Sequence, residues 1–342
     1  MQILTRSASS TIIDALGFKL TTFLERTKTM VIIRPFTPDD YPGIAAVSSI
    51  IRPDMPITGD QLRQFDENRD AMVKFGRWVA EVDGHIVGIS FHTQFTDMYH
   101  PRKLWVMVRV LPEHRRQGIG AALYTVMENS VQLLDPLALQ VAIREDETEN
   151  VRFAEVRGFY EYSRRWEALL DVATFDPTPY ADLHARLAAE GIAIRSYADL
   201  VDDPQRDQKF HALQTEVDQD VPLPDPITPQ TFEQFQREIL QSSRFFPEAT
   251  SFAVHKGEYV AMNALNKAGD NLWLDMTGTK AAYRRRGIAL ALKVWGIEFA
   301  RAHGYKTIGV TNDVANTGML AINGQLGFVR QPAMLQLQKV WE

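Results

Sequence analysis

Arg115-Arg116-Gln117-Gly118-Ile119-Gly120 is a basic, glycine-containing stretch that recurs as Arg284-Arg285-Arg286-Gly287-Ile288-Ala289, 169 residues further along the chain. A second landmark, Gly158-Phe159, recurs as Gly327-Phe328 at the same offset of 169 residues. The interval from the first arginine to the Gly-Phe pair is therefore 43 residues in both places. Two landmarks with one offset indicate an internal duplication.

A hairpin pattern precedes each copy of the motif. Residues 79–88 and 252–261 each contain a β-like run, a turn glycine and a second β-like run. The chain has 342 residues, enough for two domains of roughly 150 residues each. The prolines of Asp176-Pro177-Thr178-Pro179 cannot continue a helix or a central strand. We therefore predict two domains, residues 30–175 and 176–342, preceded by an N-terminal extension, residues 1–29.

The order of predicted elements is the same in both repeats. It runs strand, helical segment, hairpin, strand, glycine turn, helix, strand, helix and final strand. The helices after the glycine turns are the clearest, because residues 121–127 and 289–295 are rich in helix formers and apolar on one face. The predicted fold class is α/β (α+β), with each domain a mixed, mostly antiparallel twisted sheet flanked by helices.

The N-terminal extension does not have the order of a cleaved secretory signal. It contains an apolar stretch, residues 12–18, but three of its four basic residues, Lys19, Arg26 and Lys28, come after that stretch, and no longer apolar run follows. We interpret residues 1–29 as a non-essential amphipathic extension, with a docking or targeting role as the alternative. Deleting them should leave folding and activity intact.

The composition excludes several classes of function. With 37 basic and 43 acidic side chains the formal net charge is −6, and no basic block suggests a nucleic-acid partner. Cysteine is absent, which excludes disulfides, thiolate metal ligands and an acyl-cysteine intermediate. No run of about 18 apolar residues predicts a membrane span. The eight histidines form no metal-binding spacing, so we predict no metal.

The glycine turn suits a pyrophosphate. A β-like run, residues 105–110 or 272–277, leads into the turn, and a helix follows it. Glycine lets a phosphate approach the backbone, and the helix N-terminus and the arginines supply positive charge. A P-loop would need Gly-Lys-Ser/Thr, which is missing. A dinucleotide fold would need a third glycine where Leu123 stands.

The remaining match is the pattern [Arg/Gln]-x-x-Gly-x-[Gly/Ala], which resembles the CoA pyrophosphate loop of the GNAT superfamily of acyl-CoA N-acyltransferases. The second repeat adds a stretch that resembles a GNAT motif B strand and helix: Thr311-Asn312, Asn316, Met319-Leu320, Ile322-Asn323 and Leu326-Gly327-Phe328. The resemblance covers nearly all of residues 30–342, because each of the two repeats resembles one GNAT domain. It implies two tandem GNAT-like domains that bind acetyl-CoA (CoA) and transfer its acetyl group directly to an amine.

The resemblance also implies which residues bind the cofactor. The backbone of Val108 and Val110, or of Thr277 and Thr279, would pair with pantetheine. Asn312 and Asn316 are further candidates. The pyrophosphate loops would be Arg115, Arg116, Gln117, Gly118, Ile119, Gly120 and Ala121 in the first repeat, and Arg284, Arg285, Arg286, Gly287, Ile288, Ala289 and Leu290 in the second.

The catalytic acid is where the sequence departs from the family. Many members have a tyrosine four residues before the Gly-Phe glycine, but here that position holds Ala154 and Asn323. Neither can act as that acid, so water or another side chain does so, or one half is inactive. Asn323 and Asn316 remain candidate polar residues of the catalytic site.

Asp275 is the candidate base, because it interrupts an apolar run two residues before Thr277 and both should point to one face of the strand. It is either paired in the core or facing the cleft. We expect the second repeat to be the competent one, since Asp275, Asn312 and Asn316 make its polar set richer.

The expected reaction is acetylation of a small-molecule amine by a cytoplasmic monomer or homodimer. An acidic loop, residues 216–225, would suit a cationic amine, or is a solvated proline-rich loop. Two alternatives stay open: a CoA-binding sensor or pseudoenzyme module, and a peptide or protein N-acetyltransferase.

Overall fold

The computed structural model describes residues 10–13, 19–23, 30–53, 56–96, 98–223 and 225–341. The chain forms two compact units. Unit 1 comprises Met1–Val141 with Gln338–Glu342, and unit 2 comprises Ala142–Leu337. Within the described ranges, no helix is long and apolar enough to span a membrane.

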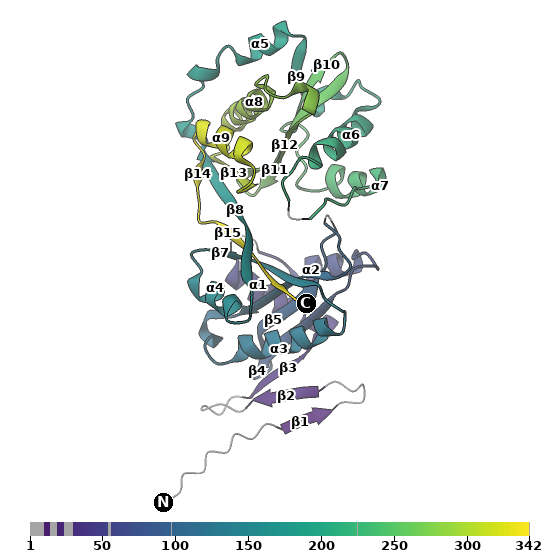
Figure 1. The fold of residues 1–342 in the computed structure, drawn as a ribbon, viewed down its shortest axis with the longest axis vertical. Coiled ribbons are helices and arrows are strands. Elements are labelled where there is room, and N and C mark those ends of the chain that lie inside the picture. Colours follow the sequence, from purple (N-terminus) through teal and green to yellow (C-terminus); the bar gives the residue numbers. More distant parts are fainter. Residues whose placement is uncertain are drawn as a thin grey trace, which may run out of the picture. The chain divides into compact units, whose positions relative to one another are not determined.

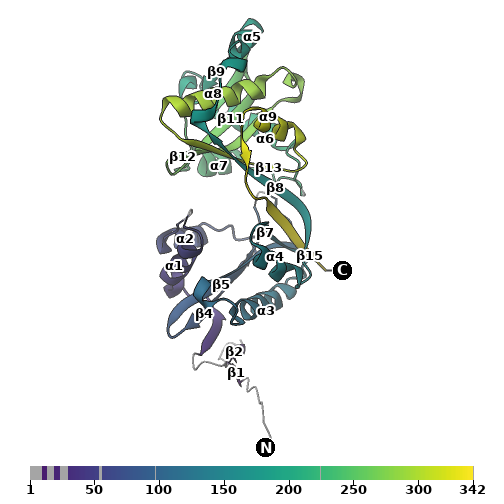
Figure 2. The same cartoon turned by 90° about the vertical axis from the view of Figure 1, so that its left-hand side faces the viewer.

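Unit 1 is a mostly antiparallel sheet between two layers of helices. From β1 to β7 the described strands neighbour one another in chain order; the pairs from β1–β2 to β5–β6 are antiparallel, and β6–β7 is parallel. Figure 2 shows α1 and α2 on one side of β4 and β5, and α3 on the other. The bounds are β1 Ser10–Ile13, β2 Lys19–Phe23, β3 Val31–Pro35, β4 Gly76–Val82, β5 His85–Thr93, β6 Lys103–Val110, β7 Ala138–Arg144, α1 Tyr41–Ile51, α2 Gly59–Glu67 and α3 Ile119–Gln132.

Unit 2 repeats this architecture. Its sheet has the order β8-β13-β12-β11-β10-β9, with β14 also pairing with β8. The β12–β13 pair is parallel, and the other five of these pairs are antiparallel. The bounds are β8 Tyr160–Asp171, β9 Ile192–Ser196, β10 Ser251–His255, β11 Glu258–Ala268, β12 Asn271–Thr279, β13 Thr307–Asp313, β14 Val329–Arg330, α4 Thr148–Glu155, α5 Leu183–Ala189, α6 Arg206–Asp218, α7 Phe232–Phe235, α8 Ile288–Ala302 and α9 Thr317–Gln325. The last strand, β15 Met334–Val340, runs across the boundary between the units.

The core of unit 2 has two sides, one on each face of the sheet. Leu292 and Val294 of α8 pack with sheet residues such as Leu274 and Val260 on one face. On the other face, α6 and α7 contribute Phe210 and Phe235 to an aromatic cluster. Figure 1 shows α8 on one side of β11 and β12, with α6 and α7 opposite. The mixed sheets with helices on both faces confirm the predicted fold class.

Strand β8 lies in the first repeat by sequence and in unit 2 by structure. It pairs with β13 along seven residues, from Thr307↔Asp171 to Asp313↔Arg165. Leu170, 1% exposed, belongs to the core of unit 2. The compact units therefore divide after Val141, whereas the predicted repeats divide at 175/176. The two boundaries differ because β8, although part of the first repeat, completes the sheet of unit 2; we call this the exchange of β8. The repeat boundary itself stays a prediction about the duplication.

Part of the N-terminal extension adds to the sheet of unit 1. Strands β1 and β2 form an antiparallel pair, and β2 pairs with β3 from Thr21↔Ile33 to Phe23↔Val31. The sequence did not predict these strands. The other residues of the extension lie outside the described residues, and its dispensability stays a prediction.

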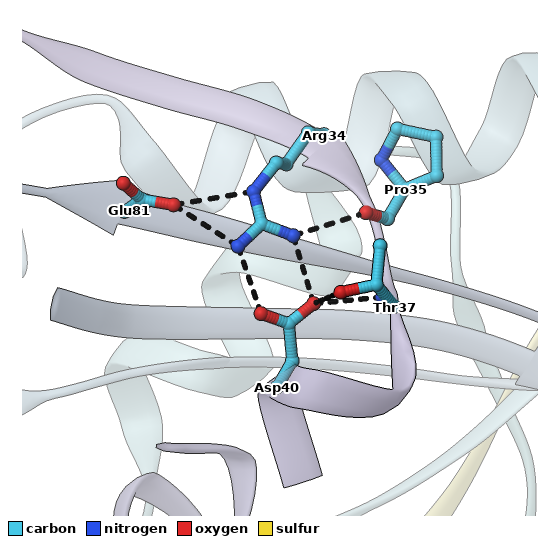
Figure 3. A network of polar contacts seen from close by, with 5 residues as sticks. All are labelled: Arg34, Pro35, Thr37, Asp40 and Glu81. Carbon is cyan, nitrogen blue, oxygen red and sulfur yellow. Dashed lines mark hydrogen bonds and ion pairs between the residues drawn. The ribbon is translucent and has the colours of Figure 1, made fainter. Parts of the chain in front are cut away.

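An arginine at the end of β3 joins three segments of unit 1. Arg34 donates to both carboxylate oxygens of Asp40, each at 2.8 Å, and to Glu81 Oε2 of β4 at 3.0 and 3.1 Å. The N–H of Thr37 also donates to Asp40 Oδ2, at 2.7 Å. Figure 3 shows Arg34 between the two carboxylates. This network fixes the connection from the opening strand to α1.

Candidate functional site

Two strands separate in the same way in each unit. In unit 1, β6 and β7 pair only from Lys103↔Ala138 to Trp105↔Gln140. In unit 2, β12 and β13 pair only from Leu272↔Ile308 to Leu274↔Val310. Among the described residues, the remainder of β6 and of β12 has no ladder partner on that side. Backbone groups there can accept an extended ligand.

The two glycine turns share one backbone conformation. Gly118 and Gly287 have φ of 84° and 79°, and Arg116 and Arg285 have φ of 62° and 61°. Each glycine is the N-cap of the following helix, α3 or α8, and no side chain among the described residues caps either one. Only glycine adopts this conformation without strain. The amides of the first helical turn are therefore available to an anion, as the sequence predicts.

The predicted pyrophosphate-loop residues are all located at these turns. Arg115 Nε donates to the backbone oxygen of Val110 at 3.0 Å, and Arg284 Nε donates to that of Thr279 at 3.1 Å. This bond ties each turn to the end of the strand before it. Ile119, Gly120 and Ala121 begin α3, and Ile288, Ala289 and Leu290 begin α8.

Acidic side chains surround the turn of unit 2. Asp220 pairs with Arg284, and Glu190 pairs with Arg286. Lys280 lies 3.3 Å from Glu216. Two acids of the loop expected to suit a cationic amine are thus paired with basic residues: Asp220 with Arg284 of the predicted cofactor site, and Glu216 with Lys280 between β12 and that turn. For these two the structure favours a structural role.

Strand β12 contains a bulge at Asp275. Ala264 of β11 pairs with Met276 and Leu265 pairs with Leu274, so Asp275 is the extra residue. Leu274 packs on the α8 face, whereas Met276 packs on the α6–α7 face. A bulge that reverses the facing of a strand breaks the alternation used to place Asp275 and Thr277 on one face. Asp275 is exposed, which contradicts the alternative that it is paired in the core.

Beyond the bulge, Thr277 faces a buried amide. Thr277 Oγ1 donates to Asn263 Oδ1 at 2.8 Å. Asn263 is fully buried, and its Nδ2 has no hydrogen-bond partner in the described structure. A Cβ on Gly296 of α8 would lie 3.1 Å from that Nδ2, so the glycine gives Asn263 its space. An unsatisfied buried donor beside the separating strands fits a polar ligand there.

The asparagines of the second repeat form a second polar group. Asn323 Nδ2 donates to Asn312 Oδ1 at 2.6 Å, and Asn323 Oδ1 is buried without a partner among the described residues. Asn316 is the N-cap of α9, because its Oδ1 accepts from Met319 N–H at 3.2 Å. The structure thus brings Asn312 and Asn323 together. It gives Asn316 a helix-capping role.

The corresponding positions of the first repeat are less polar. Ser90 and Val108 are the cross-strand pair that corresponds to Asn263 and Thr277. The register between β5 and β6 contains no bulge. Five positions of the site differ between the repeats. In each pair the residue of the first repeat is followed by the corresponding residue of the second: Ser90 and Asn263, Val108 and Thr277, Tyr124 and Lys293, Met127 and Gly296, Ala154 and Asn323.

Sequence reasoning missed Asn263 and Lys293. Both are buried, and both interrupt apolar runs, which was the signal that could have found them. Within the described residues, no three His, Cys, Asp or Glu side chains gather as metal ligands would.

Comparisons with known proteins place this geometry in a family. A model described as an acetyltransferase (GNAT) domain matches residues 75–162, and one described as the acetyltransferase (GNAT) family matches residues 210–328. A comparison with curated proteins gives no match.

Solved structures show the same tandem fold. A GCN5-related N-acetyltransferase from Sphaerobacter thermophilus is 22% identical, with a TM-score of 0.63 over 91% of this chain and 95% of that one. A tandem GNAT protein from the clavulanic acid biosynthesis pathway, without AcCoA, is 16% identical, with a TM-score of 0.68 over 91% and 98%. Domains of this family generally bind acyl-CoA and are acyltransferases. The chain belongs to the GNAT acetyltransferase superfamily and carries two of its domains in tandem.

Proposed function

We propose that the protein is an acetyl-CoA-dependent N-acetyltransferase that transfers the acetyl group directly to a small-molecule amine, and that unit 2 performs the reaction. The observation that carries this proposal is the coincidence in unit 2 of the glycine turn, the separated strands and the buried polar groups. Unit 1 has the first two and lacks most of the third.

The residues of unit 2 fit acetyl-CoA as a substrate. The amides of Ile288, Ala289 and Leu290 would hold the pyrophosphate at the N-terminus of α8. The backbone of Thr277 and Thr279 would pair with the pantetheine arm, beyond the last pair between β12 and β13. Asn263 Nδ2 and Asn323 Oδ1 are buried without a hydrogen-bond partner in the described structure. The amide groups of the pantetheine arm would supply hydrogen-bond partners for both atoms.

Transfer then needs an oxyanion donor and proton transfers. A backbone N–H of β12 in this stretch is the proposed donor to the oxyanion that forms as the amine attacks the thioester carbonyl. Asp275, exposed at the bulge, is proposed to orient the amine or accept its proton. Replacing Asp275 with asparagine should lower kcat/KM. An unchanged pH profile of kcat/KM would remove Asp275 from the mechanism.

Unit 1 supports a second candidate role, cofactor binding without turnover. Its turn has the same backbone as that of unit 2, but Ser90 and Val108 stand where unit 2 has Asn263 and Thr277. Such a unit would act as a CoA-binding module within the enzyme.

Calorimetry with acetyl-CoA and an assay of thiol release test both roles. We expect acetyl-CoA binding, and thiol release with small amines in preference to peptides. Release with peptides alone would favour a peptide N-acetyltransferase. Binding without release over both panels would favour the sensor alternative, and absence of binding would contradict the proposal as a whole.

A further inference from the structure

Lys293 is a buried lysine without a charged partner. It lies on α8 between Leu292 and Val294, and the residue is 2% exposed. Its Nζ lies 5.8 Å from the ring centroid of Phe328. Within the described residues, Nζ forms no hydrogen bond or ion pair. Burying an ammonium group without a partner is costly, and such groups concentrate at functional sites.

The first repeat shows what a structural residue at this position looks like. Tyr124 corresponds to Lys293, and its hydroxyl donates to Glu128 Oε1 at 2.8 Å. Glu128 in turn pairs with Lys339 at 2.5 Å. In unit 2 the residue one turn later is Ile297 instead of a glutamate. The tyrosine is satisfied within its own unit, and the lysine is not.

Lys293 lies on the side of α8 that faces the proposed acetyl-CoA site. An added Cβ on Gly296, one turn along the helix, would lie 3.1 Å from Asn263 Nδ2, so this face of α8 lies beside Asn263. The N–H of Phe328, whose ring is next to Nζ, donates to the backbone oxygen of Asn323 at 3.0 Å. Lys293 is thus linked through one neighbour each, Gly296 and Phe328, to two asparagines that keep an unsatisfied side-chain atom in the described structure. Those atoms are Asn263 Nδ2 and Asn323 Oδ1.

The charged groups on the surrounding elements do not neutralise Lys293. His184 of α5 lies 3.3 Å from the backbone oxygen of Ala291, Asp275 is exposed on β12, and Asp313 of β13 accepts from Ser163 at 2.7 Å. Burial alone lowers the pKa of Lys293 to about 7. The group can therefore exchange a proton near neutral pH.

We propose that Lys293 is the general acid that protonates the departing sulfur of CoA. The inference rests on the proposed function and supplies the proton donor that the tyrosine position, here Asn323, does not provide. As the amine nitrogen bonds to the carbonyl carbon, the C–S bond breaks and its electron pair goes to sulfur. The ammonium of Lys293 gives its proton to that sulfur and becomes a neutral amine. Water then returns a proton to Lys293, and the amine's own proton leaves to solvent.

The test compares Lys293→Met with Tyr124→Phe at the corresponding position of unit 1. A general acid typically contributes about 100-fold or more to the rate. We therefore expect Lys293→Met to lower kcat at neutral pH by at least about tenfold. Its Kd for acetyl-CoA should stay within about threefold, roughly 0.6 kcal/mol. In the wild type, kcat should fall as pH rises and Lys293 loses its proton, and Lys293→Met should lack this alkaline limb. Tyr124→Phe should keep the wild-type kcat and pH profile.

A stability measurement separates catalysis from structure. Because the unpaired cation is costly, Lys293→Met should raise Tm, most strongly below neutral pH and less as pH rises toward the ordinary lysine pKa. Wild-type kcat and an unchanged alkaline limb in Lys293→Met would overturn the proposal. If the wild type itself releases no thiol, the proposed function fails instead.

An NMR measurement on the wild type does not depend on the variant folding. In protein labelled with ¹⁵N-lysine, binding of CoA should shift the Nζ resonance of Lys293 and its titration midpoint. A resonance and midpoint that CoA leaves unchanged would also overturn the proposal.

Discussion

The glycine turns of units 1 and 2 are nearly identical, whereas the side chains behind them differ. Gly118 and Gly287 differ by 5° in φ (84° and 79°), and the preceding arginine takes the left-handed conformation in both units. Behind the turns, Tyr124 and Ser90 of unit 1 correspond to Lys293 and Asn263 of unit 2. The turn depends on backbone geometry that few residues permit, and the chemistry depends on side chains that a stable fold does not require. A duplicated domain can therefore keep its anion site and lose its reaction.

The strands that border the site also differ between the two units, in the regularity of their pairing. β6 pairs with β5 without a register shift, whereas β12 has the bulge at Asp275. By contrast, the hairpins further from the site each have a shift at corresponding places, between Ala80 and Glu81 and between Ala253 and Val254. The bulge at Asp275 is therefore specific to unit 2. It changes which residues face α8 at the point where the thioester would lie.

The largest expected effect concerns where each unit begins. A chain of residues 176–342 lacks β8, which pairs with all seven residues of β13 on one side. It also lacks four buried residues of β8 and the segment after it, Ala168, Leu170, Val172 and Phe175. Burial of each large apolar side chain contributes about 2 kcal/mol, so the loss is comparable to the stability of a whole domain. Residues 176–342 should fail to fold, and residues 142–342 should fold. Dispersed NMR spectra for the shorter chain would contradict this.

The next effect tests the turns. Gly287→Glu should lower the rate of thiol release by about 100-fold or more. The new carboxylate would lie beside the first amides of α8, where it would repel the pyrophosphate and occupy its place. Gly118→Glu should remove acetyl-CoA binding by unit 1 and leave turnover within about twofold. Loss of turnover with Gly118→Glu alone would reverse the assignment of the two units.

Two other glycines are matched controls for these variants. Gly84 and Gly257 both have φ of 80°, and a Cβ on either would meet no atom within 4 Å. They lie in the β4–β5 and β10–β11 hairpins, away from the glycine turns that begin α3 and α8. Gly84→Glu and Gly257→Glu therefore impose the same backbone strain outside the proposed pyrophosphate sites, and both variants should bind acetyl-CoA as the wild type does.

A smaller effect concerns the arginine that closes each opening strand. Arg34 makes paired bonds to Asp40, whereas the corresponding Arg195 is exposed and donates to the backbone oxygen of Asp199. Arg34→Met should destabilise unit 1 by about 2 kcal/mol, because buried Asp40 keeps its charge and loses its cation. Arg195→Met should cost less than about 0.5 kcal/mol. Hydrogen exchange of residues 31–40 and 192–199 measures each unit separately.

The effect of Arg34→Met should depend on pH. Burial raises the pKa of Asp40, but the bonds from Arg34 and Thr37 outweigh it and leave that pKa below the ordinary value of 3.8. A carboxyl with a lowered folded pKa stabilises the fold above its unfolded pKa, and that stability is lost as pH falls through the folded pKa. The difference between wild type and Arg34→Met should therefore shrink below about pH 4. A difference that stays constant under acid would mean that packing, and not charge, dominates.

The sequence predicted the turns well and the strand geometry incompletely. The turns follow from local residues, since only glycine fits the positions of Gly118 and Gly287. The exchange of β8 could not be predicted, because its pairing with β13 joins residues far apart in the chain that have no matching signature. The bulge at Asp275 was hidden because alternation assumes a regular ladder. The capping role of Asn316 is a local one, since its side chain bonds an amide three residues on, whereas the polar group around Asn263 appears only when α8 is packed on the sheet.

The smallest effect separates the two turns by their charge. In unit 2, Asp220 and Glu190 hold Arg284 and Arg286, which are between one third and one half exposed. Exposed ion pairs of this kind contribute about 0–1 kcal/mol each, so removing the acids should cost little stability. It would release two guanidinium groups for the pyrophosphate. The double variant Asp220→Asn/Glu190→Gln should therefore tighten the Kd of unit 2 for acetyl-CoA by about two- to fivefold at low salt, and the gain should fade as salt rises. Glu233→Gln/Asp270→Asn makes the same change in charge on the surface of unit 2 and should leave the Kd as it is. Weaker binding in the first double variant would show that the acids position the arginines for the pyrophosphate instead of competing with it.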